Sequence, residues 1–228
     1  MKFKINRNLL LKNLNNVSKG LSNKPQMPIL TGIKLDVKDR YILLTASNFD
    51  ISIQAKIDDV SYFDIEETGT CVLPGKYLLE ILRKTTSDEV IFTSFEDNIV
   101  KILANKSTFT LNAMDKDVFP YISFEESSNY INIDALNVKQ IIKKTSFATS
   151  TSESKMVLTG VSLSTSGPKI EAIATDSFRL AKKYLITDTE NPKVNVILPS
   201  KNLEELNKIL EEVEDLVQIH FLKTKVLF

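Results

Sequence analysis

The stretch Ile173-Ala174-Thr175-Asp176-Ser177-Phe178-Arg179-Leu180-Ala181 decides how this chain is interpreted. Apolar and polar residues alternate at 169–174 and again at 179–186, and the polar turn between them predicts a β-hairpin. A similar stretch, Thr45-Ala46-Ser47-Asn48-Phe49-Asp50-Ile51, lies earlier, where Asn48-Phe49 aligns with Ser177-Phe178 at a separation of 129 residues. If that separation recurs elsewhere, the chain is a tandem repeat.

A separation of almost the same length does recur. Phe3 and Ile5 align with Ile131 and Ile133 at 128 residues. The motif Leu73-Pro74-Gly75-Lys76 aligns with Leu198-Pro199-Ser200-Lys201 at 125 residues. Differences of a few residues are what loop insertions produce. The chain is therefore predicted to contain two copies of one domain, at residues 1–127 and 128–228.

Each copy consists of two similar units, in which a strand runs into a helix and further strands follow. The strands that open the units are predicted at 3–5, 71–73, 130–133 and 194–198, and their helices at 7–20, 75–84, 135–145 and 199–212. The other strands are predicted at 33–37, 41–46, 51–57, 90–94, 99–103, 108–112, 160–164 and 216–222. In the third helix we expect Leu136, Ile141 and Ile142 to face the core. The fold class is α+β.

The second copy ends earlier than the first. Phe228 aligns with Ile102, so the counterpart of residues 108–112 is missing from the second copy. A domain that ends inside a sheet leaves a neighbouring strand with an unpaired edge, which is unfavourable. We therefore expect the chain to be a fragment of a longer protein.

Composition limits the classes of protein to which the chain can belong. Its 228 residues are 43% hydrophobic, enough for one large core or two ordinary ones. No apolar run approaches the roughly 20 residues that span a bilayer, and the N-terminus lacks the apolar core of a signal peptide. We expect a soluble, cytoplasmic protein with no membrane partner. Because Cys71 and His220 are single residues of their types, we expect no internal disulfide, metal site or cofactor.

Charge is distributed unevenly along a chain whose formal net charge is zero. Residues 7–20, 76–84 and 135–145 together carry a net charge of +8, while acidic pairs such as Glu66-Glu67 lie in the connections. The fourth predicted helix is acidic and breaks the pattern. Solvated helix faces often carry lysine, but three repeated basic helices favour a shared surface that attracts phosphates without reading sequence. The chain has no Trp to stack on bases.

Catalysis is an alternative that the residues support poorly. Asp176 with Arg179, or the pair Glu66-Glu67, could in principle act in acid–base chemistry. The chain offers no set of nucleophile, base and orienting residue, and it has no glycine-rich phosphate loop. Asp176 is expected to accept hydrogen bonds from the backbone of its own turn. We therefore expect no catalytic residues.

Three motifs, together with the repeated units and the basic helices, resemble one protein family. They are residues 24–30 (Lys-Pro-Gln-Met-Pro-Ile-Leu), residues 117–120 (Asp-Val-Phe-Pro) and residues 174–181 (Ala-Thr-Asp-Ser-Phe-Arg-Leu-Ala). The chain is similar to the bacterial sliding clamp, the beta subunit of DNA polymerase III, over its whole length. The resemblance covers the first of three family domains and most of the second.

The resemblance implies a DNA-clamp fold, with antiparallel sheets outside and helices facing a central hole. It also implies a non-catalytic processivity factor, a ring that encircles and slides on duplex DNA and tethers partners through a peptide-binding groove. The implied partners are duplex DNA of any sequence, the catalytic subunit of the replicative polymerase, the clamp loader, repair polymerases, mismatch-repair proteins and, at full length, a second copy in a head-to-tail homodimer. The alternative is a protein-interaction scaffold that does not encircle DNA.

The family's functional positions can be transferred to this sequence one by one. The implied DNA-contacting residues are Lys24, Lys76, Arg83, Ser152, Lys155 and Lys201. The implied peptide groove comprises Leu158, Thr175, Ser177, Phe178, Arg179 and Leu180. The implied dimer interface comprises Lys106, Phe109 and Leu111, although Phe109 and Leu111 could equally be strand residues that face the core.

This sequence departs from the family at several of these positions. Phe178 stands where the family commonly has histidine, and Met156 and Val157 replace its polar and aromatic DNA contacts. Because the earlier copy, Asn48-Phe49-Asp50, shares the aromatic residue and lacks the arginine, we expect Phe178 to be partly structural. The residues specific to the groove would then be Thr175 and Arg179.

Overall fold

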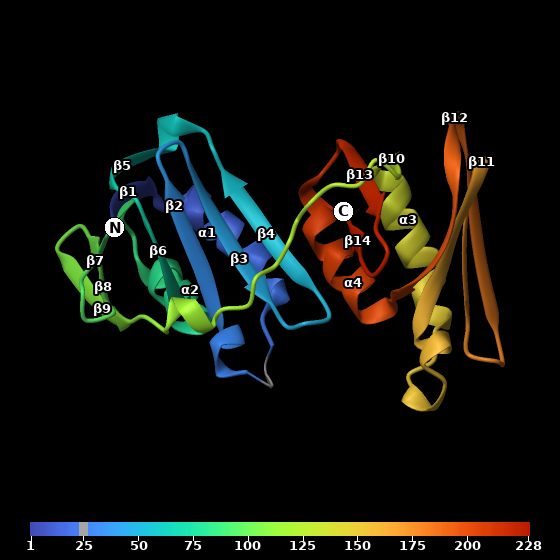
Figure 1. The fold of residues 1–228 in the computed structure, drawn as a ribbon, viewed down its shortest axis with the longest axis horizontal. Coiled ribbons are helices and arrows are strands. Elements are labelled where there is room, and N and C mark those ends of the chain that lie inside the picture. The colour runs from blue at the N-terminus through green and yellow to red at the C-terminus, as the bar shows by residue number, and fades with distance from the viewer. Residues whose placement is uncertain (23–26) are drawn as a thin grey trace. The chain divides into compact units, whose positions relative to one another are not determined.

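A computed structural model describes residues 1–22 and 27–228, which form two units, Met1–Ile122 and Ser123–Phe228 (Figure 1). The units meet a few residues before position 127, where the sequence had placed the boundary. The reason is that residues after Ile122 attach to unit 2: the Ser127 carbonyl oxygen lies 2.8 Å from His220 Nδ1, and Lys225 donates to the Ser123 carbonyl. Among the described residues, no helix is long and apolar enough to cross a membrane.

Unit 1 contains two helices and nine strands among its described residues. In chain order they are β1 (Lys2–Asn6), α1 (Arg7–Val17), β2 (Gly32–Lys38), β3 (Tyr41–Ser47), β4 (Ser52–Ile57), β5 (Phe63–Glu67), β6 (Gly69–Pro74), α2 (Gly75–Lys84), β7 (Glu89–Ser94), β8 (Ile99–Ala104) and β9 (Ser107–Asn112). Short 3-10 helices lie at Ser18–Gly20, Pro28–Thr31, Val60–Tyr62 and Lys116–Val118. The strands form two antiparallel sheets, ordered β5-β1-β7-β8-β9 and β4-β3-β2-β6.

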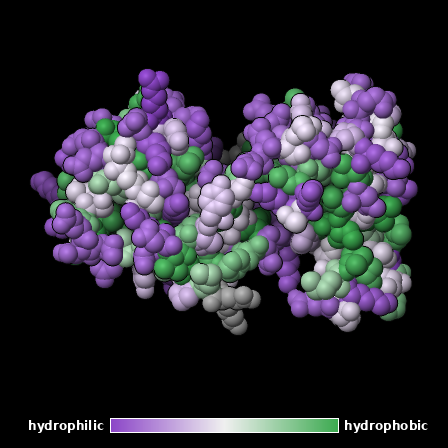
Figure 2. Space-filling model, viewed as in Figure 1, coloured by the Kyte–Doolittle hydropathy of each residue, from purple (hydrophilic) through white to green (hydrophobic). Residues whose placement is uncertain are grey.

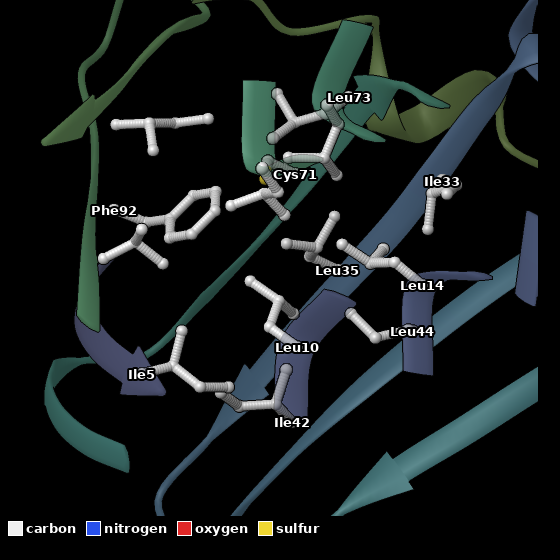
Figure 3. Packing of buried hydrophobic residues seen from close by; sticks show 14 of the residues in the cluster. Ile5, Leu10, Leu14, Ile33, Leu35, Ile42, Leu44, Cys71, Leu73 and Phe92 are labelled. Carbon is white, nitrogen blue, oxygen red and sulfur yellow. The ribbon is translucent and has the colours of Figure 1, made fainter. Parts of the chain in front are cut away.

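Helix α1 forms where the sequence predicted it, for identifiable reasons. The side chain of Asn6 accepts a hydrogen bond from the Leu9 backbone N–H at 3.0 Å and so caps the first turn. Leu10, Leu14 and Val17 recur at helical spacing and are fully buried. Figure 3 shows Leu10 and Leu14 pointing toward side chains of β2 and β3 in the core. Helix α2 packs beside α1 and against β2 and β6, so the two helices share one side of the four-stranded sheet.

Cys71 on β6 lies inside this core, and we predict that its thiol is unreactive. Burial raises its pKa to about 12, so at pH 8 almost none of it is the nucleophilic thiolate. Labelling by a disulfide reagent at pH 8, followed at the Cys71 peptide by mass spectrometry, should be at least about a hundredfold slower in native than in urea-unfolded protein. Similar rates in both states would contradict the burial of Cys71.

Unit 2 repeats this plan. It contains β10 (Tyr130–Asp134), α3 (Ala135–Thr145), β11 (Gly160–Thr175), β12 (Leu180–Pro199), α4 (Ser200–Ile209), β13 (Leu216–Phe221) and β14 (Val226–Leu227). Short 3-10 helices lie at Ser146–Ala148, Glu153–Thr159 and Leu210–Glu212. The sheets are β10-β13-β14 and β11-β12, and α3 packs on α4, β11 and β12.

The pairings of unit 2 match those of unit 1 residue by residue. Val161 pairs with Leu198 as Ile33 pairs with Leu73, and Ala174 pairs with Ala181 as Ala46 pairs with Ile53. The predicted runs 160–164 and 169–174 are joined in the single long strand β11, whose register shifts near Gly167. The α+β class and the repeat of strand–helix–strands units are thus confirmed.

One core prediction in α3 is wrong. Leu136 does not face the core, since it is 58% exposed, whereas Ile141 and Ile142 are buried as expected. Val138 takes the inward position instead. Residues 138, 141, 142 and 145 follow the spacing of one helix face, and Leu136, two residues before Val138, points to nearly the opposite side.

Candidate functional site

The exposed face of α2 presents two of the predicted DNA-contacting residues. Lys76 and Arg83 are seven residues apart, or two helical turns, so they lie on the same side of α2, and both are exposed. Glu80 lies between them and pairs with Lys84 at 2.7 Å. The hydrogen bond and the charge of Lys84 lower the pKa of Glu80, so this carboxylate stays ionised and paired at neutral pH. The two cations on this face are therefore available to an outside anion.

Hydrogen bonds from two arginines hold α1 and α2 together. Arg83 donates to Asn15 Oδ1 on α1 at 2.7 Å. Arg7, at the start of α1, donates through Nε to the Leu82 carbonyl at 2.8 Å and thereby satisfies a carbonyl in the last turn of α2. Arg7 was counted among the basic charges of the first helix, but its guanidinium is partly used inside the unit.

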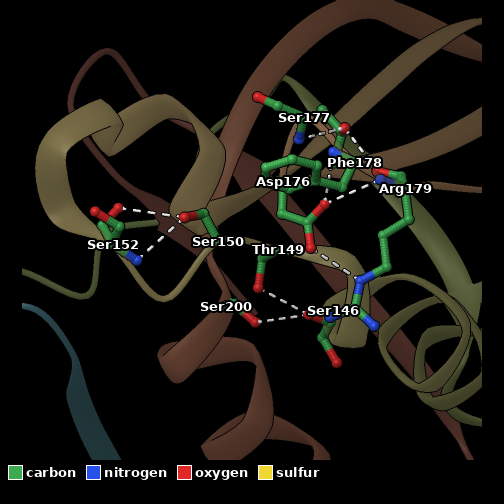
Figure 4. Close-up of polar contacts among 10 residues, drawn as sticks. Ser146, Thr149, Ser150, Ser152, Asp176, Ser177, Phe178, Arg179 and Ser200 are labelled. Carbon is green, nitrogen blue, oxygen red and sulfur yellow. Dashed lines mark hydrogen bonds and ion pairs between the residues drawn. The ribbon is translucent and has the colours of Figure 1, made fainter.

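Unit 2 brings the predicted loop contacts beside α4. Lys201 on α4 has a side chain that is 92% exposed, and its Nζ lies 4.0 Å from Glu153 of the loop that carries Ser152 and Lys155. A hydrogen bond of 2.7 Å from the Ser150 backbone N–H to the Leu158 carbonyl closes this loop. Both Ser152 and Lys155 are exposed, and Figure 4 shows Ser150 and Ser152 linked by hydrogen bonds.

The other basic residues have mixed positions. Lys143 and Lys144 on α3 are exposed, but Lys139 is half-buried and donates to the Val213 carbonyl at 3.3 Å. The charge of Lys139 therefore stabilises the turn after α4, and the exposed charge on α3 is smaller than the sequence count. Lys24 lies outside the described residues.

Residues 175–180, which we call the elbow, form a turn held by side-chain hydrogen bonds. Asp176 Oδ1 accepts from the backbone N–H groups of Phe178 and Arg179, both at 3.0 Å, and Oδ2 accepts from Arg179 Nε at 2.9 Å (Figure 4). Thr175 Oγ1 accepts from the Ser177 N–H at 3.1 Å and donates to the Arg179 carbonyl at 2.7 Å. The backbone hydrogen bonds, more than Arg179's side chain, lower the pKa of Asp176. The expected backbone-bonding role of Asp176 is confirmed.

Unit 1 contains the same turn. Asn48 Oδ1 accepts from the backbone N–H groups of Asp50 and Ile51, at 3.1 and 3.0 Å. Phe49 occupies the left-handed region at φ 74°, as Ser177 does at φ 79°. These two observations align Asn48 with Asp176 and Phe49 with Ser177, at a separation of 128 residues rather than 129.

The alignment of Phe49 with Phe178 is therefore wrong, and so is the structural role it suggested. Phe178 corresponds to Asp50, which shows that the turn does not need an aromatic residue at that position. The side chain of Phe178 is 98% exposed. The sequence misled us because the shared phenylalanine was a stronger match than the turn chemistry, in which Asn and Asp play the same role.

Ser177 gives a prediction about stability. A residue with a Cβ is unfavourable at φ 79°, so Ser177→Gly should raise the free energy of unfolding by about 0.5–1 kcal/mol, after the loss of glycine's larger unfolded entropy. Ser177→Ala, which keeps the Cβ, is the matched control and should not stabilise. Urea denaturation followed by circular dichroism measures both. A midpoint for Ser177→Gly at or below that of Ser177→Ala would show that the elbow is not strained.

Phe147 is a neighbour of the elbow that the sequence analysis missed. The Arg179 guanidinium carbon lies 5.8 Å from the centre of the Phe147 ring, a cation–π distance. Phe147 lies in the 3-10 helix that follows α3 and is 58% exposed. The signal in the sequence was an apolar residue just beyond the end of the predicted helix, off its inward face.

The remaining groove residues flank this contact. Leu180 is exposed at the start of β12, and Leu158 is half-buried just before β11. Figure 2 shows hydrophobic side chains gathered in one area of unit 2, on the right of the view, whereas on unit 1 they are more scattered. The exposed hydrophobic residues of unit 2 include Phe147, Met156, Val157, Phe178 and Leu180.

The predicted interface residues lie at an edge of unit 1. Strand β9 is the last strand of its sheet, and Lys106 is exposed in the turn that precedes it. Phe109 and Leu111 are half-buried and pack against the core of their own unit. They thus fit the alternative that they are core-facing strand residues, while their strand still offers an unpaired edge to a partner.

Comparisons with known proteins match both units to one family. Residues 1–123 match the N-terminal domain of the DNA polymerase III beta subunit, and residues 132–228 match its central domain. The chain is 37% identical to the beta sliding clamp of Staphylococcus epidermidis, a match that covers all of this chain and 62% of that protein.

Solved structures agree. A sliding clamp from Bacillus subtilis is 34% identical with a TM-score of 0.95, over 99% of this chain and 61% of that one. A Pseudomonas aeruginosa sliding clamp bound to griselimycin is 25% identical with a TM-score of 0.90, over the same shares. This chain thus spans about 62% of the length of the curated relatives that it matches. It belongs to the family of DNA polymerase III beta subunits, the bacterial sliding clamps, and contains the N-terminal and central domains of that family.

Proposed function

We propose that this chain is part of a processivity factor, a ring-forming clamp that encircles duplex DNA and slides on it. The observation that carries the proposal is the repeated helix pair, which in each unit lies on one side of a sheet and exposes basic residues. Lys76 and Arg83 form this face on α2, and Lys201 with the loop of Ser152 and Lys155 forms it in unit 2. In the full-length protein these helices would line the central hole.

The charge on this face suits a protein that must hold DNA and still move along it. The cations are exposed, so each phosphate contact is weak, screened by salt and independent of sequence. A ring retains DNA by topology, and weak contacts then keep the barrier to sliding low. The protein would act in the cytoplasm as a non-catalytic accessory subunit of the polymerase.

The elbow is the proposed site for partner peptides. Its hydrogen bonds hold Thr175 and Arg179 in place, and exposed apolar side chains surround it, which is the composition of a peptide-binding surface. Leu158, Ser177, Phe178 and Leu180 complete the site. The partners would be the replicative polymerase, the clamp loader, and repair and mismatch-repair proteins.

Strand β9 is the proposed contact with a second copy. Its free edge, with Lys106 nearby, would pair with an edge strand of the other subunit in a head-to-tail dimer of the full-length protein. Phe109 and Leu111 would support that strand from the core side.

Primer extension tests the proposed function. The full-length protein, the replicative polymerase and the clamp loader are combined on a primed circular template, with excess competitor template added at the start. A processivity factor should lengthen the product of one binding event at least about tenfold, because dissociation then limits synthesis less often than in its absence. A scaffold that binds polymerase without encircling DNA would leave the product length unchanged and would disprove the proposal.

A further inference from the structure

The side chain of Phe178 has no evident role in the fold. It is 98% exposed, and the hydrogen bonds that form the elbow come from backbone groups and from Thr175, Asp176 and Arg179. Unit 1 forms the same turn with Asp50 in the equivalent position. The fold therefore does not require an aromatic ring here, and a ring in water adds an exposed apolar surface.

We propose that Phe178 selects partners, by contacting an aromatic side chain of the peptide that binds at the elbow. This inference rests on the proposed function of the elbow as a peptide site and adds a preference to it. The ring is carried on a turn that three hydrogen bonds to Asp176 hold in place, so little backbone freedom is lost on binding. Aromatic residues on such rigid supports are common in the contacts that dominate binding.

The charges of the elbow favour a peptide over a nucleic acid as the occupant. Residues 175–180 carry one acid and one base, Asp176 and Arg179, which pair at 2.9 Å. Arg179 also lies over the ring of Phe147. A protein that stacks bases needs excess positive charge for the phosphates, and the elbow has none. The neighbouring exposed side chain, Leu180, extends the apolar surface instead.

A peptide series on full-length protein tests the preference. The parent is the C-terminal 20-residue peptide of the replicative polymerase of the same organism, and each position is replaced in turn by Phe and, separately, by Leu. Isothermal titration should find one position where Phe binds about tenfold more tightly than Leu. Phe178→Ala and Phe178→Asp should abolish that difference, while Phe178→Tyr should keep it. Asp50→Ala, at the equivalent position of unit 1, should leave it unchanged.

The outcomes separate this inference from the function on which it rests. If wild-type protein binds none of the peptides, both are wrong. If it binds them and Phe178→Ala keeps the same preference for Phe over Leu, the elbow is a peptide site but Phe178 does not select its ligand. If Phe178→Ala weakens binding of a single-stranded oligonucleotide and leaves the peptides unaffected, the ring stacks on bases and the proposal is overturned.

Discussion

Lys76→Glu, Arg83→Glu and Lys201→Glu, combined in the full-length protein, should weaken binding to a short DNA duplex by about a hundredfold at low salt. Each substitution replaces attraction for a phosphate by repulsion on the exposed helix faces. The slope of the logarithm of affinity against the logarithm of salt concentration should fall in magnitude by about three, roughly 0.9 for each phosphate that the protein no longer neutralises. Fluorescence anisotropy of labelled duplex at several salt concentrations measures both quantities.

A matched triple substitution controls for overall charge. Lys38→Glu, Lys101→Glu and Lys223→Glu make the same change in net charge at exposed positions on β2, on β8 and in the turn after β13. These positions lie off the helices, so DNA affinity should change much less. If the matched triple weakens binding as much as the helix triple, the helix faces do not bind DNA and net charge alone explains the effect.

Asp176→Ala should weaken binding of the polymerase C-terminal peptide by about a hundredfold while leaving DNA affinity intact. The substitution removes the acceptor of two backbone N–H groups and of Arg179 Nε, so the elbow loses its shape and Arg179 its position. Isothermal titration measures the peptide, and anisotropy measures DNA. Because the folded-state pKa of Asp176 is lowered, the carboxylate is ionised above its unfolded value of 3.8, and peptide affinity should be flat between pH 6 and 8.

The equivalent substitution in unit 1 is the control. Asn48→Ala removes the acceptor of the same two backbone hydrogen bonds, from a turn of the same shape. It should affect the stability of unit 1 and leave peptide binding unchanged. Equal losses of peptide affinity from Asp176→Ala and Asn48→Ala would mean that general destabilisation is responsible, and the elbow would no longer be the candidate peptide site.

Local patterns carried most of the fold. The recurring separation of about 128 residues and the apolar spacing in α1 and α2 predicted the repeat and the helix pairs, because both depend on residues close together in sequence. Strand β5 was missed because Asp64, Glu66 and Glu67 make its residues look like a polar connection. Its place in the sheet comes from pairing with β1, some sixty residues away, which no local pattern records.

The candidate site shows the same division. Thr175, Asp176 and Arg179 were recognisable because their hydrogen bonds stay within one turn. The contact between Arg179 and Phe147 was not, since it joins residues separated by two other elements. Charge counting likewise could not show that Lys139 is bound to a carbonyl of unit 2, because that bond forms only when distant parts of the chain pack.

Encirclement of DNA is the central claim, and retention on circular DNA tests it most directly. Full-length protein is loaded onto nicked circular plasmid by the clamp loader and passed through a gel-filtration column at high salt, where charge contacts are screened. The protein should remain with the circular DNA and should be released when a restriction enzyme linearises it. Equal loss from circular and linear DNA at high salt would show that the protein binds DNA without encircling it.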